Sequence, residues 1–296
     1  MSGKNRSGYY YIFLEILFWS WFPVVTAITV AKIPPLLASG ASTFVAAIFF
    51  FFYVWTYQLW PKRISKKALR GLLISTFLIG IVFYILVFYA AVLTQAGNIN
   101  LLLMLQILFS LVLFRKVRGE SLTLIETIGC CFMLCGALLV LFPQDLNFAT
   151  GDLLLLAAAF LAPFGNYFVK QARSEMSAQF IMLIRSIISG IVILICSFFI
   201  EENLPSPSLE LHWAMVLING IFLIGLSKVF WIEALHRMPI AKVASFTTIT
   251  PYISLLWIYI FFGTQPGWQQ IAGGLPLIVG TVLIVRNKKS LNAGIV

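Results

Sequence analysis

Long apolar stretches, separated by short polar segments, run through almost the whole chain. A helix needs about 20 mainly apolar residues to cross the hydrocarbon core of a bilayer, and ten stretches of about this length can be marked. The polar segments between them are too short to hold a further domain. The pattern therefore predicts an all-α polytopic membrane protein, with transmembrane helices at 9–30, 36–59, 69–93, 96–114, 122–141, 151–169, 178–200, 213–235, 240–262 and 268–285.

The composition agrees with this pattern, since 61% of the residues are hydrophobic and only 10% are charged. The net charge of +10 alone could indicate a nucleic-acid partner, so the position of the basic residues decides its meaning. Seventeen of the 20 lysines and arginines fall on one side of the predicted membrane, and the other side holds Lys32 with several acidic residues. This distribution follows the positive-inside rule and predicts that both termini are cytoplasmic. Contact with anionic lipid head groups is a second role for these residues, and no nucleic-acid partner is needed to explain them.

An internal repeat is found when the sequence is compared with itself at an offset of 144 residues. The offset pairs Gly129 with Gly273 and Gly136 with Gly280, together with other matching residues. Each half holds five predicted helices, an odd number, so the second half enters the membrane in the opposite orientation. Such an inverted repeat suits alternating access to a site at mid-membrane, and a duplication kept only for packing is the alternative. The predicted repeats cover 9–141 and 151–285.

Four sequence blocks carry a resemblance to a known family. The blocks "FYAAVLTQAGNINLLLMLQILFSLVLF" and "RGESLTLIETIGCCFMLCGALLVL" have the counterparts "FWIEALHRMPIAKVASFTTITPYISLLWIYIFF" and "GTQPGWQQIAGGLPLIVGTVLI" in the second half. Together they resemble the two EamA-type halves of the drug/metabolite transporter superfamily. The proline expected in the ninth helix is present as Pro251, whereas Ile107 stands at that place in the fourth.

The resemblance implies a ten-helix permease with a substrate cavity between its two halves and with the fifth and tenth helices packed on the outside. It also implies a small organic substrate, such as an amino acid, a nucleotide-like compound or a drug. No cofactor is expected.

Three charged residues are predicted to lie inside the membrane. A charged side chain near the centre of a spanning helix costs about 2.5 to 3.5 kcal/mol, so each needs an explanation. Glu15, Arg185 and Lys228 share a depth of roughly 9 to 11 Å below the cytoplasmic interface, at a rise of about 1.5 Å per residue. We expect Glu15 to pair with Lys228 or Arg185, which leaves the other cation to face an anionic substrate group or to take part in gating. The alternative is that both cations extend their side chains to the cytoplasm.

Glu233 lies near the end of the same predicted helix as Lys228. It is five residues from Lys228, or about 140° around the helix, so it faces elsewhere. His236 and Arg237 follow it at i+3 and i+4. We therefore expect a boundary ion pair with these residues rather than with Lys228.

Polar and aromatic side chains at membrane depth complete the candidate site. Amides and hydroxyls there either link helices or contact a ligand, and the sequence leaves both roles open. Trp231 shares a helix face with Lys228, and the offset of 144 pairs Lys228 with Tyr84. The candidates for the substrate cavity or its gate are Glu15, Trp19, Tyr84, Asn100, Gln106, Asn166, Arg185, Lys228, Trp231 and Thr250.

Four prolines fall within predicted helices, and each is expected to kink or break its helix. They are Pro23, Pro163, Pro251 and Pro276. The glycines at 129, 136, 273 and 280 are spaced by seven residues within each helix and are expected to allow close helix packing.

These patterns together predict a secondary transporter, either an exporter or an exchanger, of a small organic metabolite in a bacterial inner membrane. A non-transporting receptor or assembly subunit is the alternative. A membrane enzyme is disfavoured because the sequence has no zinc motif, nucleophile elbow, paired catalytic carboxylates or phosphate-binding glycine loop. The four cysteines have no metal-ligand spacing, so no metal site is predicted. If transport is coupled to protons, Glu15 is the first candidate to carry one; facilitated diffusion needs no such group.

Overall fold

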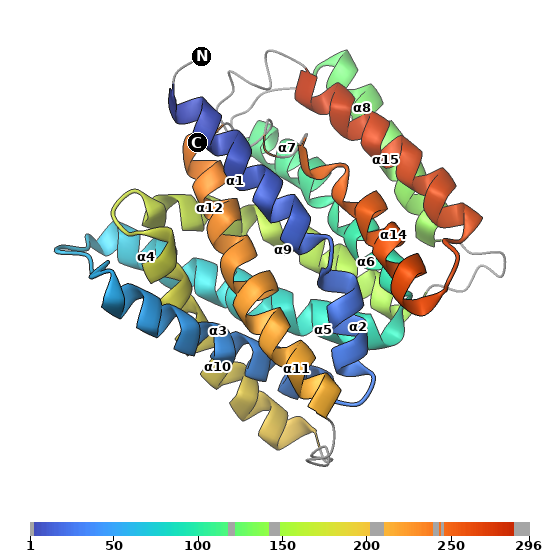
Figure 1. Ribbon diagram of the computed structural model, residues 1–296. Helices are drawn as coiled ribbons and strands as arrows, with labels where there is room; N and C mark the ends of the chain where they lie inside the picture. Colours follow the sequence, from blue (N-terminus) through green and yellow to red (C-terminus); the bar gives the residue numbers. More distant parts are fainter. Residues whose placement is uncertain are drawn as a thin grey trace.

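The computed structural model describes residues 3–117, 122–141, 149–201, 210–238, 243 and 246–286, and the regular structure within them is helical (Figure 1). The helices of the first half are α1 (Gly3–Trp19), α2 (Phe22–Val30), α3 (Pro35–Thr56), α4 (Lys66–Ser75), the π-helix η1 (Thr76–Phe83), α5 (Tyr84–Leu93), α6 (Ala96–Leu103), α7 (Gln106–Val117) and α8 (Leu124–Leu141). Those of the second half are α9 (Thr150–Arg173), α10 (Ala178–Ile200), α11 (Glu210–Ile218), the π-helix η2 (Asn219–Leu226), α12 (Ser227–Arg237), α14 (Thr250–Phe262) and α15 (Trp268–Arg286).

Adjoining helices combine into ten apolar segments, in the order that the sequence predicts. Seven segments of the described residues are long and apolar enough to cross a membrane. The shorter apolar helices Leu124–Val140, Thr250–Phe262 and Trp268–Ile284 complete the ten. Most of the predicted start of the ninth helix, near Ile240, lies outside the described residues. The predicted all-α polytopic fold is confirmed.

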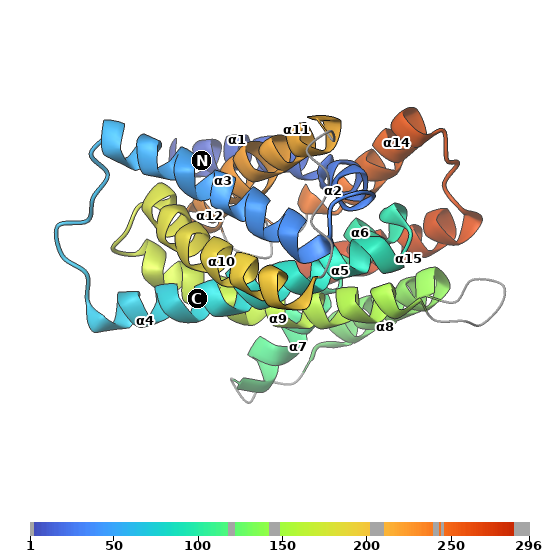
Figure 2. The same cartoon turned by 90° about the horizontal axis from the view of Figure 1, so that it is seen from below.

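The two halves pack against each other in a two-fold symmetric pattern. The second segment, α3, lies along its counterpart α10, and the fifth, α8, lies along its counterpart α15. The first segment contacts the eighth through α1 and α12, and the equivalent contact of the sixth with the third joins α9 to α4 and α5. Figures 1 and 2 place the α8–α15 pair at one side of the bundle and the α3–α10 pair at the other. This is the packing of two inverted five-helix repeats.

Irregular backbone occurs at matching places in the two halves. The third segment becomes π-helical at Thr76 and the eighth at Asn219, positions that differ by 143. The α-helix of the fourth segment is interrupted directly before Gln106 and that of the ninth directly before Thr250, positions that differ by 144. The irregular positions therefore agree with the offset of 144 found in the sequence to within one residue. The π-helices were not predicted, and π-helical turns often mark functional positions.

Two of the four predicted proline breaks are observed. Pro23 and Pro251 lie in the first turn of α2 and α14, where their missing N–H would have had no partner within the helix. By contrast, α9 and α15 continue through Pro163 and Pro276 without interruption, so neither of these prolines breaks its helix, and the expected kink stays a prediction. The fourth segment is interrupted although Ile107 stands in the place of a proline. That interruption therefore does not require a proline.

Glycines bring α8 and α15 into backbone contact. A Cβ atom on Gly273 would lie 2.6 Å from the carbonyl oxygen of Gly136, and one on Gly129 would lie 2.8 Å from that of Gly280. The sequence repeat pairs Gly129 with Gly273, whereas the contacts are crossed. Crossed contacts are what a two-fold axis between two helices produces. The four glycines thus pack the helices closely, as their spacing predicts.

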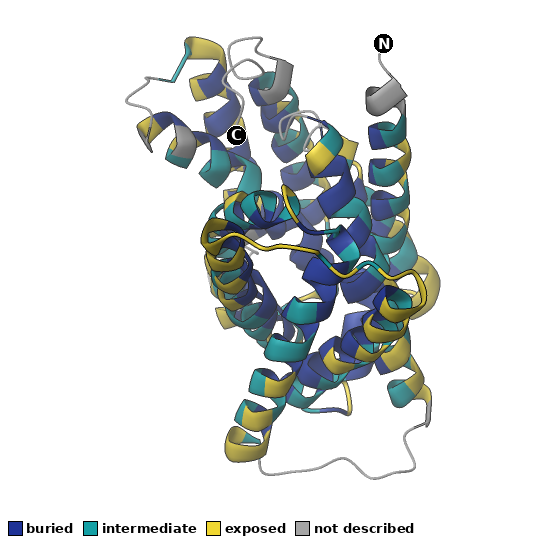
Figure 3. Ribbon diagram, turned by 90° about the vertical axis from the view of Figure 1, so that its left-hand side faces the viewer, coloured by how far each residue is buried: buried dark blue, intermediate teal, exposed yellow. Residues whose placement is uncertain are grey.

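Exposed residues lie on the outer faces of the helices (Figure 3), and many of them are large and apolar. Phe52 and Phe198 are 62% and 76% exposed, which would be unfavourable in water but allows contact with lipid tails. Trp55, Trp60 and Trp268 are also exposed and lie at or near segment ends, as in the aromatic belt of membrane proteins. The molecule therefore presents an apolar outer surface to the bilayer.

Two glutamates join the halves at opposite ends of the bundle. Both N–H groups that begin α3, those of Leu36 and Leu37, donate to the carboxylate of Glu201 at 2.7 and 2.9 Å. At the other end, the N–H and hydroxyl of Ser65 donate to Glu175 at 2.8 and 2.7 Å. These two bonds, the backbone N–H first, hold the pKa of Glu175 below its usual value, so this link stays charged at neutral pH. We call the end near Glu175 the basic end, because Lys62 and Arg63 of the α3–α4 loop and Lys66, Lys67 and Arg70 of α4 lie there.

Candidate functional site

One cavity lies between the two halves. It contains about 850 Å³ of atom-free space, the open solvent at its mouth included. Its walls come from both repeats and include the start of α7 and of α14. All ten residues proposed from the sequence lie in its lining: Glu15, Trp19, Tyr84, Asn100, Gln106, Asn166, Arg185, Lys228, Trp231 and Thr250.

Glu15 pairs with Lys228, one of its two expected partners. The Lys228 Nζ atom lies 3.4 Å from Oε1 of Glu15, and the side chains are only 14% and 3% exposed. The same Nζ atom lies 3.2 Å from the centroid of the Trp19 ring, a favourable cation–π position. The Trp19 ring stacks at 4.1 Å on Phe22. Lys228 is thus held by a carboxylate and an aromatic ring within the bundle and does not extend to the basic end.

Arg185 is the second buried cation of the cavity. The side chain is almost fully buried, and it makes no ion pair with any carboxylate among the described residues. Its guanidinium interacts electrostatically with the Tyr84 hydroxyl, yet neither that hydroxyl nor Nη2 of Arg185 has a hydrogen bond of good geometry in the described structure. Its stem passes over Gly80 of η1, where a Cβ atom would lie 2.9 Å from Cγ of Arg185. The π-helical turn and a residue without a side chain therefore make room for Arg185.

The amides of the cavity wall partly link helices, which was one of their two expected roles. Asn100 Nδ2 donates to the Ser254 hydroxyl at 2.7 Å and so joins α6 to α14. Trp231 Nε1 donates to Oδ1 of Asn166 at 3.2 Å and joins α12 to α9. The other Asn100 amide atom, Oδ1, and the Thr250 hydroxyl have no hydrogen-bond partner in the described structure. These two groups remain available to a ligand.

A layer of aromatic residues lies between the cavity and the end away from the basic loops. The Trp21 and Trp257 rings lie 4.3 Å apart, and the Phe22 ring meets that of Phe88 edge-on at 6.1 Å. These contacts join the first segment to the third and the ninth. They leave the cavity in the part of the bundle nearer the basic end.

At the end away from the basic loops, a buried polar cluster links three helices, and the sequence did not predict it. Asp152 accepts hydrogen bonds from the Thr94 hydroxyl and, at 3.2 Å, from the Asn98 amide. Gln270 Nε2 donates to Asn98 Oδ1 at 2.9 Å and to Gln95 Oε1 at 3.1 Å. The cluster links α6, α9 and α15. In the sequence Asp152 is only one of several acidic residues near segment ends, so nothing marks it as special.

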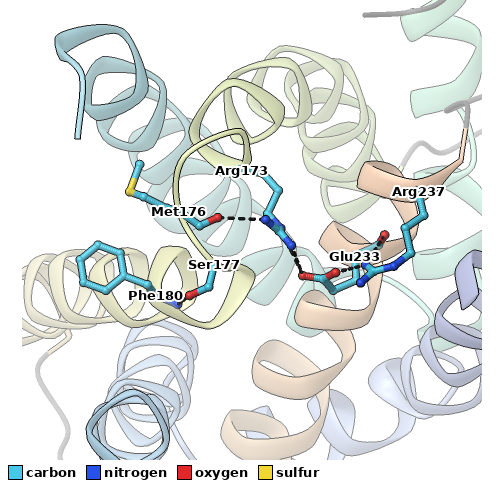
Figure 4. A network of polar contacts seen from close by, with 6 residues as sticks. All are labelled: Arg173, Met176, Ser177, Phe180, Glu233 and Arg237. Atoms are coloured by element: carbon cyan, nitrogen blue, oxygen red, sulfur yellow. Dashed lines mark hydrogen bonds and ion pairs between the residues drawn. The ribbon is translucent and has the colours of Figure 1, made fainter. Parts of the chain in front are cut away.

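Glu233 is the centre of an ion-pair network at the basic end (Figure 4). The ion pair predicted with Arg237 is present at the i+4 position. In addition, Arg173 at the end of α9 donates from Nε and Nη2 to Oε1 of Glu233 at 3.1 and 2.7 Å. The Arg237 guanidinium also lies 4.5 Å from the centroid of the Tyr11 ring, which brings in α1. Arg173 was missed because it is 60 residues away in the sequence, and only helix packing brings it to Glu233.

Among the described residues, no three His, Cys, Asp or Glu side chains come together as a metal site requires.

The comparison with known proteins agrees with this architecture. Residues 6–142 and again residues 149–286 match the EamA-like transporter family. The chain belongs to the EamA-like transporter family. The resemblance inferred from the sequence blocks is thereby confirmed, and both halves of this EamA-like protein carry the family pattern.

Relatives of this EamA-like protein are themselves named as uncharacterized transporters. The chain is 26% identical over 279 residues to YoaV of Bacillus subtilis, with 90% of each chain covered. It is 24% identical over 292 residues to YvbV of the same organism, with 96% of this chain and 93% of YvbV covered. A transporter of Methanothermobacter thermautotrophicus is 22% identical over 301 residues, with 95% and 87% covered.

One solved structure, titled only as the crystal structure of a protein, has a TM-score of 0.69 and 18% identity and covers 96% of this chain and 98% of its own. At that identity it shows the fold alone.

The family match and the named relatives together show that the EamA-like protein is a multi-pass membrane transporter. Its family implies a small-molecule substrate and a lipid bilayer as its surroundings.

Proposed function

We propose that this transporter is a secondary carrier that moves a small organic metabolite by alternating access, as an exporter or an exchanger, and that it is not an enzyme. The observation that carries the proposal is the cavity between the halves, in which Glu15, Lys228 and Arg185 converge. Ionisable residues inside a membrane are costly and usually mark a substrate or ion pathway. Inverted repeats commonly place that pathway at their interface.

The two ends of the bundle carry different closing contacts. The Glu233 network ties α9, α12 and α1 at the basic end, whereas the Asp152 cluster ties α6, α9 and α15 at the other. A cycle that opens the cavity to each side in turn has to break one set while it keeps the other. The interruptions before Gln106 and Thr250 give two of the cavity-lining segments a place to bend.

We propose that the basic end faces the cytoplasm of a bacterium and that the protein lies in the inner membrane, with both termini cytoplasmic. A membrane-impermeant maleimide is expected to label Lys32→Cys in intact cells and Lys62→Cys only after permeabilisation. Both lysines are exposed and lie at opposite ends of α3. The unaltered chain, with its four cysteines, gives the background. Labelling in the reverse order would contradict the proposed orientation.

Solute counterflow in proteoliposomes tests the transport proposal. A thermal-shift screen of the purified protein against a metabolite library supplies the solute. We expect labelled solute to enter vesicles preloaded with the unlabelled compound and not to enter vesicles without protein. Dependence of net uptake on a pH gradient would indicate proton coupling, with Glu15 as the first candidate, and its lack would indicate facilitated diffusion or exchange. Binding without counterflow would instead favour a receptor or assembly subunit.

A further inference from the structure

The charges of the cavity do not balance. Three charged side chains line it, and Glu15 compensates Lys228 at 3.4 Å. Arg185 is 4% exposed and has no carboxylate partner in the described part of the chain. A buried guanidinium without a counter-charge is unfavourable, and a bound anion would remove that cost. The lining therefore carries one net positive charge that nothing in the described protein neutralises.

Unused hydrogen-bonding atoms surround this charge. Nη2 of Arg185 and the hydroxyl of Tyr84 are buried and lack a partner of good geometry, although the two side chains interact electrostatically. Together they offer donors to the oxygens of one carboxylate, and arginine suits that planar group. Oε2 of Glu15 and Oδ1 of Asn100 are likewise buried and unpaired, and both are acceptors. A ligand that fits this set has a carboxylate and, apart from it, at least one hydrogen-bond donor.

Two helices begin in the cavity wall. Gln106 and Ile107 open α7, Thr250 and Pro251 open α14, and all four residues line the cavity. The aligned peptide dipoles give the first turn of a helix a partial positive charge. In α7 the Ile107 and Phe109 N–H groups donate to the Met104 and Leu105 carbonyls, so this turn contributes through its dipole rather than through free donors. Interrupted membrane helices use such turns to hold anionic groups. The helix ends and Arg185 thus favour the same sign of ligand charge.

The inverted repeat shows that the fold does not require these charges. At the offset of 144, Ala41 matches Arg185, Ala159 matches Glu15 and Tyr84 matches Lys228. Equivalent positions in equivalent helices therefore fold without a charge. Arg185 is retained at a cost that its counterpart avoids, which points to a role in binding.

We propose that the cavity takes an organic monoanion, a carboxylate with a separate hydroxyl or amide donor, and that Arg185 with Tyr84 holds the carboxylate. This inference rests on the proposed transport function and names its substrate class. A zwitterion carries no net charge and would leave the charge of Arg185 uncompensated overall, so it binds more weakly than the monoanion of the same shape. A cation is excluded by the same balance.

Compounds of equal shape and different charge test the proposal. Three skeletons are used, those of lactate, mandelate and 3-phenyllactate. Each is supplied as the hydroxy acid, a monoanion; its neutral hydroxy amide; the matching amino acid, a zwitterion; and the amino amide, a cation. Calorimetry on the purified protein is expected to show at least about tenfold tighter binding of the monoanion than of its three analogues, for at least one skeleton.

The variants connect this preference to the site. Arg185→Gln is expected to abolish the preference, Arg185→Lys to retain part of it, and Tyr84→Phe to weaken monoanion binding several-fold. Lys62→Gln, which removes an exposed charge that does not line the cavity, is the matched control and should leave all affinities unchanged. Equal melting temperatures of Arg185→Gln and the unaltered protein, without ligand, show that any loss of binding is local.

Several results would overturn the proposal. The first is equal or tighter binding of the amide, the zwitterion or the cation than of the monoanion. The second is a preference for the monoanion that survives Arg185→Gln. The third is the failure of all three monoanions to bind. Sodium chloride is also titrated alone. Chloride binding would contradict the organic-monoanion proposal if it depends on Arg185 and if none of the monoanions displaces the chloride. Counterflow with the same compounds separates the two proposals: carriage of a neutral or cationic member refutes the anion inference alone, whereas no carriage of any compound counts against transport too.

Discussion

Replacing Glu15 by glutamine is expected to destabilise the protein by about 3 to 5 kcal/mol, because breaking a buried ion pair leaves a buried charge without compensation. The charge is that of Lys228, whose Nζ atom lies 3.4 Å from Glu15 and is shielded from water. The cation–π contact with Trp19 would remain, but it is weaker than the ion pair. Reversible unfolding in mixed micelles at neutral pH measures the effect.

A double-mutant cycle shows whether the loss comes from this pair. Lys228→Met removes the unpaired ammonium, so Glu15→Gln combined with Lys228→Met should recover most of the stability lost in Glu15→Gln alone. Additive losses of the two single variants would show that the residues are not coupled.

The same two variants also test the roles of Glu15 and Lys228 in transport. If Glu15 carries a coupled proton, Glu15→Gln removes the dependence on a pH gradient, and unchanged dependence would exclude this role. Retained transport and affinity in Lys228→Met would limit Lys228 to a structural role.

Valine in place of Gly136 is expected to destabilise the α8–α15 pair by about 1 to 3 kcal/mol, the usual cost of overfilling a packed site. A side chain at Gly136 meets the backbone of Gly273 and the side chain of Leu277, and a carbonyl oxygen cannot move aside as a flexible side chain can. The two helices would have to separate. Unfolding in mixed micelles, together with cross-linking of cysteines placed along the two helices, reports both the loss and the separation.

The neighbouring residue supplies the control for this variant. Cys135 is on the same helix, one position earlier, and its side chain is exposed on the outer face. Cys135→Val adds similar bulk toward lipid and should change stability little. Equal effects at positions 135 and 136 would show that the close contact with α15 contributes nothing to stability.

Much of the fold was predictable because the bilayer imposes simple requirements on the sequence. Length and apolar character mark the ten segments, and the offset of 144 reveals the repeat. Depth along a helix also placed Glu15 and Lys228 at one level, and their contact confirms that reasoning. The cavity candidates were found for a related reason: a polar side chain in lipid needs a partner, a ligand or water, and the cavity between the halves is where these side chains lie.

The sequence could not predict contacts between side chains of different helices, because these depend on how the helices approach one another. The choice of Lys228 over Arg185 as the partner of Glu15 follows from the α1–α12 contact, which no local pattern encodes. Arg173 reaches Glu233, and Asp152 reaches Asn98, across separations of 60 and 54 residues. The π-helical turns are similarly hidden, since Thr76 and Asn219 begin them in stretches that read as ordinary apolar helix.

The crossed glycines of α8 and α15 bear on how such a carrier could move. When two halves exchange conformations, a helix pair that the two-fold axis maps onto itself keeps the same set of contacts, while helix pairs that map onto each other must trade places. The α8–α15 pair belongs to the first kind, because the axis exchanges the Gly129–Gly280 contact for the Gly136–Gly273 contact within the same pair. The α1–α12 and α5–α9 contacts belong to the second. If the halves exchange conformations in this way, the α8–α15 pair keeps its contacts at the side of the bundle while the helix contacts around the cavity rearrange.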